Sequence, residues 1–265
     1  MKNTLLFLIL VALNVVHAQE RLFLSDEKYQ SISSDINGYL YITTDHSIAQ
    51  YDIYGNKIKS FSNPSFGNIT SIDTRIPSKI LVFNQESGNI TLLNNELVEI
   101  NSKLNLFDKG WMNIALASMG SSDRIVLYNN IKQELLITDL NLNIVSISHI
   151  QFSEEFNPTD IQVVPNQQIA LIDTSKGICL FDFYGTYEKQ IPLRNVPSVH
   201  FRKNHFFYFQ NGKLYKYTLP SDKSPLKIEE VLYDFEPKIK AFTIVLENVF
   251  YINSSQNIEK RTILH

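Results

Sequence analysis

A short apolar pattern recurs six times along the chain, and this repeat constrains the fold more than any other feature. The copies are spaced by about 37 to 45 residues, a period that is typical of propeller blades and solenoid repeats. A second apolar run follows each copy after about ten residues. The first runs begin at Gly38, Lys79, Arg124, Gln168, His205 and Asn248, and the second runs at Ile48, Ile90, Leu135, Ile178, Leu214 and Ile258.

The composition of these runs predicts strands. They are too short for helices and are rich in Ile, Val, Phe and Tyr, which favour β-structure. Asn, Asp, Ser and Gly lie between them and predict turns. Because one further strand fits before each pair and another after it, we predict an all-β fold, a six-bladed β-propeller with four-stranded antiparallel blades.

Two of the units share a distinctive turn. Residues 51–60 read YDIYGNKIKS and residues 181–190 read FDFYGTYEKQ, and in both the Asp-x-Tyr-Gly stretch supplies a glycine for positive φ between the third and outer strands. The last unit, 239–264, contains only three candidate strands, so RLFLS from Arg21 is the candidate for its outer strand. A strand from the N-terminus would close a ring, whereas a solenoid does not need one, and the ring is therefore favoured.

The first unit, NGYLYITTDHSIAQYDIYGNKIKSF, resembles a blade of the NHL-type six-bladed propellers, and the fourth unit shares the likeness. The Asn-x-Arg-Ile signature of many such blades is missing, as are the Trp-Asp ends of WD40 repeats, since Trp111 is the single tryptophan. The chain is also similar to secreted propeller proteins of Gram-negative bacteria. This resemblance implies a fold and a location, but a shared fold does not transfer an activity.

The first twenty residues, MKNTLLFLILVALNVVHAQE, have the pattern of a secretory signal peptide. Lys2 is followed by an apolar run from Leu5 to Val16 and by the small-residue pattern Val-His-Ala before Gln19. We predict a signal peptide over 1–18, a single propeller domain over 19–265, and export to the periplasm or the extracellular space. The apolar run is shorter than the roughly 20 residues of a membrane-spanning helix, so no transmembrane segment is predicted in the mature chain.

The net charge excludes one class of partner, and the single cysteine is predicted to be structural. The net charge of −3 without a Lys/Arg block argues against nucleic acid. Cys179, the single cysteine, lies in the apolar stretch GICLFDF, where we predict a buried small hydrophobe. No cofactor is predicted, and the expected partner is a protein or a peptide.

The loops that lead into the first strand of each unit place aromatic rings beside acids. If these groups are exposed, they form a binding face for a protein or peptide, with Trp111 as the anchor, and the protein is a non-catalytic scaffold in the cell envelope. Alternatively, each ring packs between blades and the acids are only solvated. The residues concerned are Phe66, Phe107, Trp111, Glu154, Glu155, Phe156 and Phe235.

Two further sets of polar residues have alternative interpretations. Asn84, Asn129, Asp173 and Asn253 each end a strand, where their oxygens would either bind a cation or cap the following turn. Asp73, Asp160 and His200 fall in the predicted inner strands. These three are the candidates for the alternative function, a metal-dependent hydrolase or lyase with its site on the channel axis; the favoured prediction has no catalytic residue and no metal.

Overall fold

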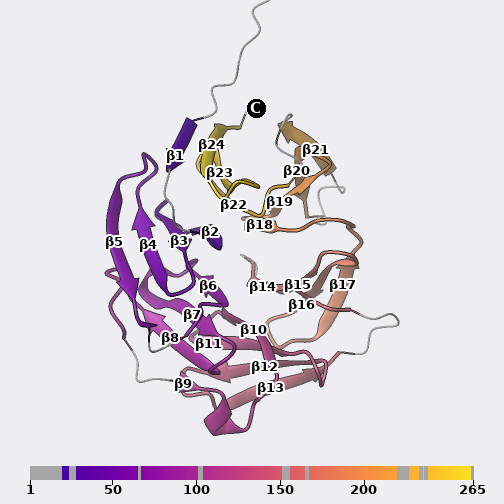
Figure 1. Ribbon diagram of the computed structural model, residues 1–265. Coiled ribbons are helices and arrows are strands. Elements are labelled where there is room, and N and C mark those ends of the chain that lie inside the picture. The colour runs from indigo at the N-terminus through magenta and orange to yellow at the C-terminus, as the bar shows by residue number, and fades with distance from the viewer. Residues whose placement is uncertain are drawn as a thin grey trace, which may run out of the picture.

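The computed structural model describes residues 20–23, 28–64, 67–100, 104–150, 156–164, 167–219, 227–232, 235 and 238–263. Six four-stranded antiparallel sheets surround a central axis in these residues, so the predicted all-β six-bladed propeller is confirmed (Figure 1). Helix is limited there to short 3-10 turns, among them Pro77–Lys79 and Phe107–Lys109. No helix of the described part of the chain is long and apolar enough to cross a membrane. The predicted signal peptide and the site residues Phe66, Glu154 and Glu155 lie outside the described residues.

The blades follow one another along the chain, and each begins at the axis. Blade 1 contains β2 (Ser31–Ser34), β3 (Leu40–Thr43), β4 (Ser47–Tyr51) and β5 (Lys57–Ser62). Blade 2 contains β6 (Ser71–Asp73), β7 (Ile80–Asn84), β8 (Asn89–Leu93) and β9 (Leu104–Asn105). Blade 3 contains β10 (Ile114–Met119), β11 (Arg124–Asn129), β12 (Glu134–Asp139) and β13 (Ile144–His149).

The second half of the ring repeats this order. Blade 4 contains β14 (Asp160–Val163), β15 (Ile169–Asp173), β16 (Gly177–Phe181) and β17 (Tyr187–Ile191). Blade 5 contains β18 (Val199–Arg202), β19 (His205–Gln210), β20 (Lys213–Thr218) and β21 (Lys227–Leu232). Blade 6 contains β22 (Ala241–Val245), β23 (Asn248–Ile252) and β24 (Ile258–Thr262), with β1 (Glu20–Phe23) as its outer strand.

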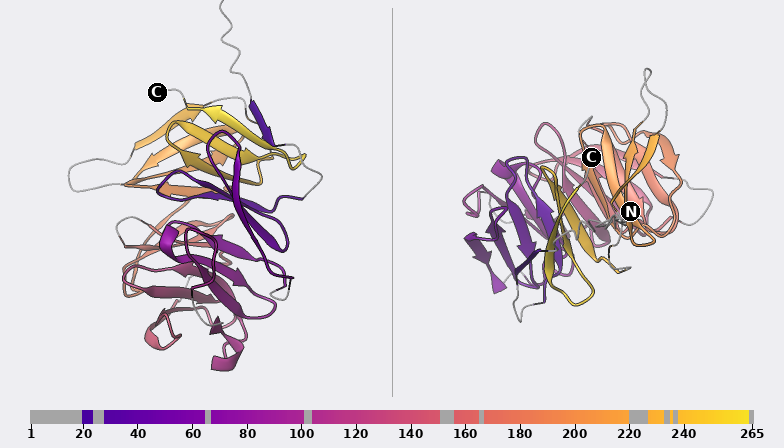
Figure 2. Two further views of the ribbon diagram at one scale, coloured as in Figure 1. Left: turned by 90° about the vertical axis from the view of Figure 1, so that its left-hand side faces the viewer. Right: turned by 90° about the horizontal axis from the view of Figure 1, so that it is seen from above.

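Blade 6 joins the two ends of the chain. β1 pairs antiparallel with β24, with Arg21 opposite Glu259. Figure 2 shows the indigo β1 beside the yellow C-terminal strands. Arg21–Phe23 of the outer strand predicted from RLFLS therefore lie at the outer edge of blade 6, while Leu24 and Ser25 lie outside the described residues.

The core consists of layers between neighbouring blades. Both faces of the second strands are covered by other blades. This is why β7 and β15 are buried along their whole length and are apolar up to their last residues, Asn84 and Asp173. Outer strands such as β5 alternate in exposure instead. Cys179 is fully buried between blades, as predicted, and burial, aided by the Asp173 charge, raises the pKa of its thiol to about 12.

The Asp-x-Tyr-Gly turns have the predicted conformation. Gly55 and Gly185 have φ of 92° and 88°. The Asp52 carboxylate accepts a hydrogen bond from the backbone N–H of Tyr54 at 2.9 Å. In the equivalent turn, Asp182 accepts one from Tyr184 at the same distance. This arrangement is a three-residue hairpin loop that ends in a left-handed residue.

The two faces of the ring differ in their loops. Adjacent strands within a blade are antiparallel, so the loops that cross to the next inner strand lie on the same face as the loops that join second and third strands. We call this face the crossover face. The loops that join first to second and third to outer strands lie on the opposite face.

Candidate functional site

The inner strands β2, β6, β10, β14, β18 and β22 surround the axis (Figure 1) and carry the three channel candidates. Asp73 ends the short β6, and Arg75 follows in the next turn, so the Arg75 side chain folds back onto the carboxylate. Arg75 Nε donates to Asp73 Oδ1 at 2.9 Å, and a second guanidinium nitrogen contacts Oδ2. From blade 3, Ser118 Oγ and the Met119 N–H donate to Oδ2, each at 2.9 Å.

These contacts hold the Asp73 carboxylate in its charged form. Burial alone would raise the pKa of Asp73, but the Arg75 guanidinium and the hydrogen bonds from Arg75 and Ser118 outweigh it and hold the pKa below its usual value. Both carboxylate oxygens are engaged by protein donors from blades 2 and 3. Asp73 therefore joins two blades.

Asp160 begins β14 and bonds within its own strand. Its oxygens accept the Ile161 N–H at 2.8 Å and Gln162 Nε2 at 2.7 Å, and Gln162 Nε2 also donates to the Val199 carbonyl of blade 5 at 2.9 Å. Burial raises the pKa of the Asp160 carboxyl, and the Asp73 charge adds to this; the two hydrogen bonds and the Arg75 charge act in the other direction.

His200 belongs to a third set of contacts. Its Nδ1 lies 3.4 Å from Thr243 Oγ1, which in turn lies 2.7 Å from Ser34 Oγ, so blades 5, 6 and 1 are linked. Burial, reinforced by Arg202, lowers the pKa of His200 to about 4, and the ring is neutral at pH 7.

Asp73 and His200 thus take part in contacts between blades, whereas Asp160 bonds within its own strand to Gln162, which in turn reaches blade 5. Within the described residues, no group of three or more His, Cys, Asp and Glu side chains is arranged to hold a metal ion. Thr74 Oγ1 adds a bond to the Ser34 carbonyl at 3.0 Å, which joins blade 2 to blade 1. The main effect of these polar groups is to fix the inner strands to one another.

The strand-end Asn and Asp residues cap turns, as one of the two interpretations predicted. Each side-chain oxygen accepts a backbone N–H a few residues further along. The pairs are Asn84 with Ser87 at 2.8 Å, Asn129 with Ile131 at 3.1 Å, Asp173 with Ser175 at 2.7 Å and Asn253 with Asn257 at 2.9 Å.

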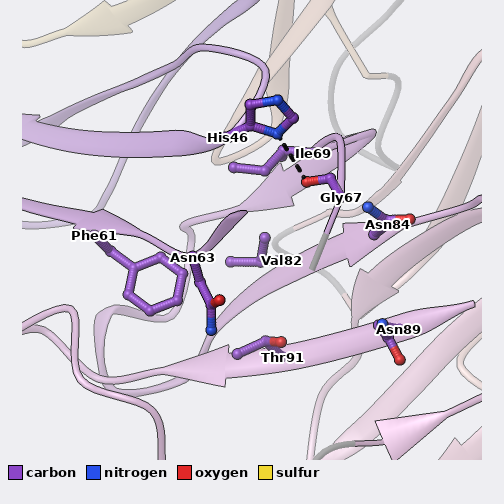
Figure 3. Close-up of a pocket in the computed structure, with 9 residues that line it drawn as sticks. All are labelled: His46, Phe61, Asn63, Gly67, Ile69, Val82, Asn84, Asn89 and Thr91. Carbon is purple, nitrogen blue, oxygen red and sulfur yellow. Dashed lines mark hydrogen bonds between the residues drawn. The ribbon is translucent and has the colours of Figure 1, made fainter. Parts of the chain in front are cut away.

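A narrow pocket lies at the seam of blades 1 and 2 (Figure 3). Phe61, Ile69 and Val82 form its apolar part, and His46 Nδ1 lies 3.2 Å from the Gly67 carbonyl at one side. The amides in its wall bond to their neighbours: Asn84 Nδ2 donates to the Asn68 carbonyl at 2.6 Å, and Asn89 Oδ1 accepts from Asn105 Nδ2 at 2.7 Å. These bonds make the pocket a packing feature of the seam.

Two of the predicted binding aromatics are core residues, which corrects the expectation of an exposed face. Phe156 is buried between blades 3 and 4. Phe235 is buried against Phe209 and Tyr251, with ring centroids 4.6 and 5.3 Å away, and the Arg261 guanidinium lies 4.9 Å from its centroid. Both rings lie between blades because burying a whole aromatic ring is worth about 2 kcal/mol or more.

Trp111 and Phe107 are only partly buried and lie in the loop that leads into blade 3. Phe107 packs on Gly88, where a Cβ would approach the ring to 2.7 Å. The backbone N–H of Trp111 donates to the Leu106 carbonyl at 3.0 Å, and the Trp111 side chain packs against the core between blades 2 and 3. Gly110, with φ of 76°, permits this tight loop.

The structure adds two residues to this region that the sequence analysis did not identify. Met112 follows Trp111 and is 64% exposed, and Ile131 is exposed at the tip of the loop between β11 and β12. The two loops meet, since the Asn130 N–H donates to the Asn113 carbonyl at 3.3 Å. Among the described residues, Met112 and Ile131 are the large, exposed hydrophobic side chains of the crossover face.

The opposite face carries exposed hydrophobic side chains at the tips of separate turns. They include Ile36 and Tyr54 in blade 1, Val98 in blade 2, Tyr184 in blade 4 and Leu246 in blade 6. Single apolar residues of this kind are common on protein surfaces.

The comparisons with known proteins identify the fold. No family model and no curated protein matches the chain. Among solved structures, a streptogramin B lyase is 13% identical over 93% of this chain and 98% of that chain, with a TM-score of 0.65. The virginiamycin B lyase of Staphylococcus aureus is 14% identical over 91% of this chain and 82% of that chain, with a TM-score of 0.59. The Pan2 WD40 domain of Neurospora crassa is 13% identical over 88% of this chain and 74% of that chain, also with a TM-score of 0.59. Since these neighbours include both lyases and a WD40 domain, the likeness extends to the β-propeller fold alone.

Proposed function

We propose that the protein is a non-catalytic binding module that engages a protein or peptide partner through the crossover face of blade 3. The contact surface, which we call the blade-3 patch, consists of Trp111, Met112 and Ile131. The observation that carries this proposal is the backbone hydrogen bond between Asn130 and Asn113, since the exposed Met112 and Ile131 are the next residues on either side of it and Met112 directly follows the partly buried tryptophan.

The chemistry of the patch suits a partner that presents an apolar side chain. Trp and Met are enriched at protein interfaces, and a tryptophan that is already fixed by packing loses little conformational entropy on binding. Asp108, Lys109 and Lys132 are exposed around the patch and provide a polar rim. A small apolar centre with a polar rim is the usual anatomy of a transient interface.

The proposal includes export and kinship with secreted NHL-like propellers of Gram-negative bacteria. Support for export comes from the leader pattern before Gln19, and support for the kinship from the Asp-x-Tyr-Gly turns of blades 1 and 4. Intact-mass analysis of the protein recovered from its own cells tests export. A mature chain that starts at Gln19 is the expected result, and retention of the first 18 residues in the cytosol contradicts it.

The alternative remains a metal-dependent hydrolase or lyase on the channel axis. Its candidate residues Asp73, Asp160 and His200 each hydrogen-bond to different protein groups, and these contacts support a role in holding the inner strands in place rather than in catalysis.

Capture of partners from the envelope fraction tests the proposed surface. The double substitution Met112→Ser with Ile131→Ser should reduce capture at least tenfold, which corresponds to about 1.4 kcal/mol. Leu246→Ser is the matched control, since Leu246 is 62% exposed on the opposite face. If the control abolishes capture and the double variant retains it, the binding face has been assigned to the wrong side.

A further inference from the structure

The outer strand of each blade is a sheet edge, and most of these edges are protected by charge. A free edge presents unpaired N–H and C=O groups, and soluble proteins usually guard it with Lys or other charged residues, a bulge or a very short strand. β9 has only two residues. Four longer outer strands carry charged residues instead: β1 (Glu20, Arg21), β5 (Lys57, Lys59), β17 (Glu188, Lys189) and β21 (Lys227, Glu229, Glu230).

β13 of blade 3 is different. Its six residues, Ile144–His149, read IVSISH and include no Asp, Glu, Lys or Arg. Ile144, Val145 and Ile147 are exposed hydrophobic side chains on this strand. β13 does have a register shift against β12, but β5, β17 and β21 have one as well, so a bulge does not replace the missing charge.

The outer backbone of β13 is available for pairing. The Ile150 N–H donates to the Gln133 carbonyl of the β12 side at 2.8 Å. Because backbone groups alternate in direction along a strand, Ile147 and His149 direct their N–H and C=O groups away from β12. Among the described residues, no strand pairs with this edge.

One side of the β13 ribbon is already covered by blade 4. Ser146 Oγ donates to the Tyr184 carbonyl at 3.0 Å, and Gly185 lies so close to Ser148 that a Cβ there would be 2.8 Å from the hydroxyl. The exposed Ile147 lies on the other side of the ribbon. The strand is therefore held in place while its edge stays open.

We propose that β13 pairs antiparallel with β13 of a second copy of this chain, about a two-fold axis at Ile147. In this register Ile147 of each copy exchanges both backbone hydrogen bonds with Ile147 of the other, and the two blade-3 sheets become one continuous sheet. Self-pairing requires that a strand tolerate its own sequence opposite itself. In β5 or β21 it would bring Lys next to Lys or Glu next to Glu, whereas β13 has no such charge, and this singles out a second copy as the occupant.

Light scattering and sedimentation of the mature protein over a range of concentrations test this dimer. The wild type should reach twice the monomer mass, and Ile147→Lys should remain at the monomer mass because two lysines would meet at the axis. Ile58→Lys on β5 is the matched control and should still dimerise, since Ile58 is 43% exposed and Ile147 44% exposed. Circular dichroism and the unfolding temperature check that each variant is folded.

If Ile147→Lys does not fold, Val145→Lys on the same strand replaces it, with the same expected loss of the dimer. Amide hydrogen exchange gives an independent readout: the Ile147 N–H should exchange more slowly as the wild-type concentration rises. A wild type that stays monomeric at every concentration, or a dimer that both lysine variants leave intact, overturns the proposal.

Discussion

Replacement of Asp73 by Asn removes the charge that joins blades 2 and 3. The Asn side chain has the same shape, but its NH2 group replaces one carboxylate oxygen and cannot accept a hydrogen bond. It must therefore face either the Arg75 Nε donor at Oδ1 or the Ser118 and Met119 donors at Oδ2. Removal of one partner from a buried ion pair typically costs 3 to 5 kcal/mol. Because the Arg75 side chain is 32% exposed and partly solvated, we expect the lower end, about 3 kcal/mol.

For a domain of this size, that loss lowers the unfolding temperature by about 6 to 12 °C. Urea unfolding of the wild type and Asp73→Asn measures the free energy directly, and Asp108→Asn, an exposed acid in the blade-3 loop, is the control. The difference should also depend on pH. Since the folded pKa of Asp73 is lowered, its stabilisation is present above the unfolded pKa of about 4 and is lost as the pH falls through the folded value. A loss below about 1 kcal/mol at pH 7, or one unchanged at pH 3, would refute this account of the blade contact.

Three further outcomes follow from the structure. His200, with a folded pKa of about 4, should make the protein lose about 3 kcal/mol as the pH falls from about 6.5 to 4, because only the unfolded state binds the proton there; His200→Gln should flatten this slope in denaturation curves. Gly177→Ala should cost about 3 kcal/mol or more, because the new Cβ would lie 2.5 Å from the Leu193 nitrogen and closer still to the Ile191 carbonyl, whereas Gly110→Ala, with open space around it, should cost only about 1 kcal/mol. The Cys179 thiol, with a pKa of about 12, should resist alkylation in the native protein at pH 8 and react in urea, and stoichiometric native labelling would contradict its burial.

The period and the strands could be predicted because a blade is buried on both faces. That burial requires unbroken apolar runs such as the four residues that begin at Ile80, and such runs recur at a regular spacing. The type of turn between the third and outer strands could be predicted from the sequence only in blades 1 and 4, where glycine occupies the left-handed position. In blades 2 and 3 the same position holds Leu97 and Leu142, with φ of 58° and 60°. Burial of a leucine is worth about 1.5 to 3 kcal/mol and offsets the roughly 1 to 2 kcal/mol cost of that backbone conformation, so packing overrides the turn rule.

The residues of the candidate binding surface were harder to predict from the sequence than the strands. Phe156 and Trp111 occupy equivalent positions before an inner strand, yet one ring is buried and the other partly exposed, a difference that depends on packing between blades and not on local sequence. Met112 and Ile131 are isolated apolar residues in polar segments. Their proximity depends on the contact between Asn113 and Asn130, which no local pattern encodes.

The two proposals for blade 3 constrain each other. β13 runs towards the crossover face, since the loop after it leads into the inner strand of blade 4. Antiparallel pairing of β13 with its copy reverses that direction, so the two blade-3 patches of a dimer would face opposite ways. A single flat partner could then bind only one of the two patches, so dimerisation would not increase its affinity. The dimer could instead link two separate partner molecules, one at each patch. Ile147→Lys should therefore leave the affinity for a soluble monovalent partner unchanged while it abolishes the ability to link two partner-coated surfaces; a loss of monovalent affinity would mean that the patch and the edge are not independent.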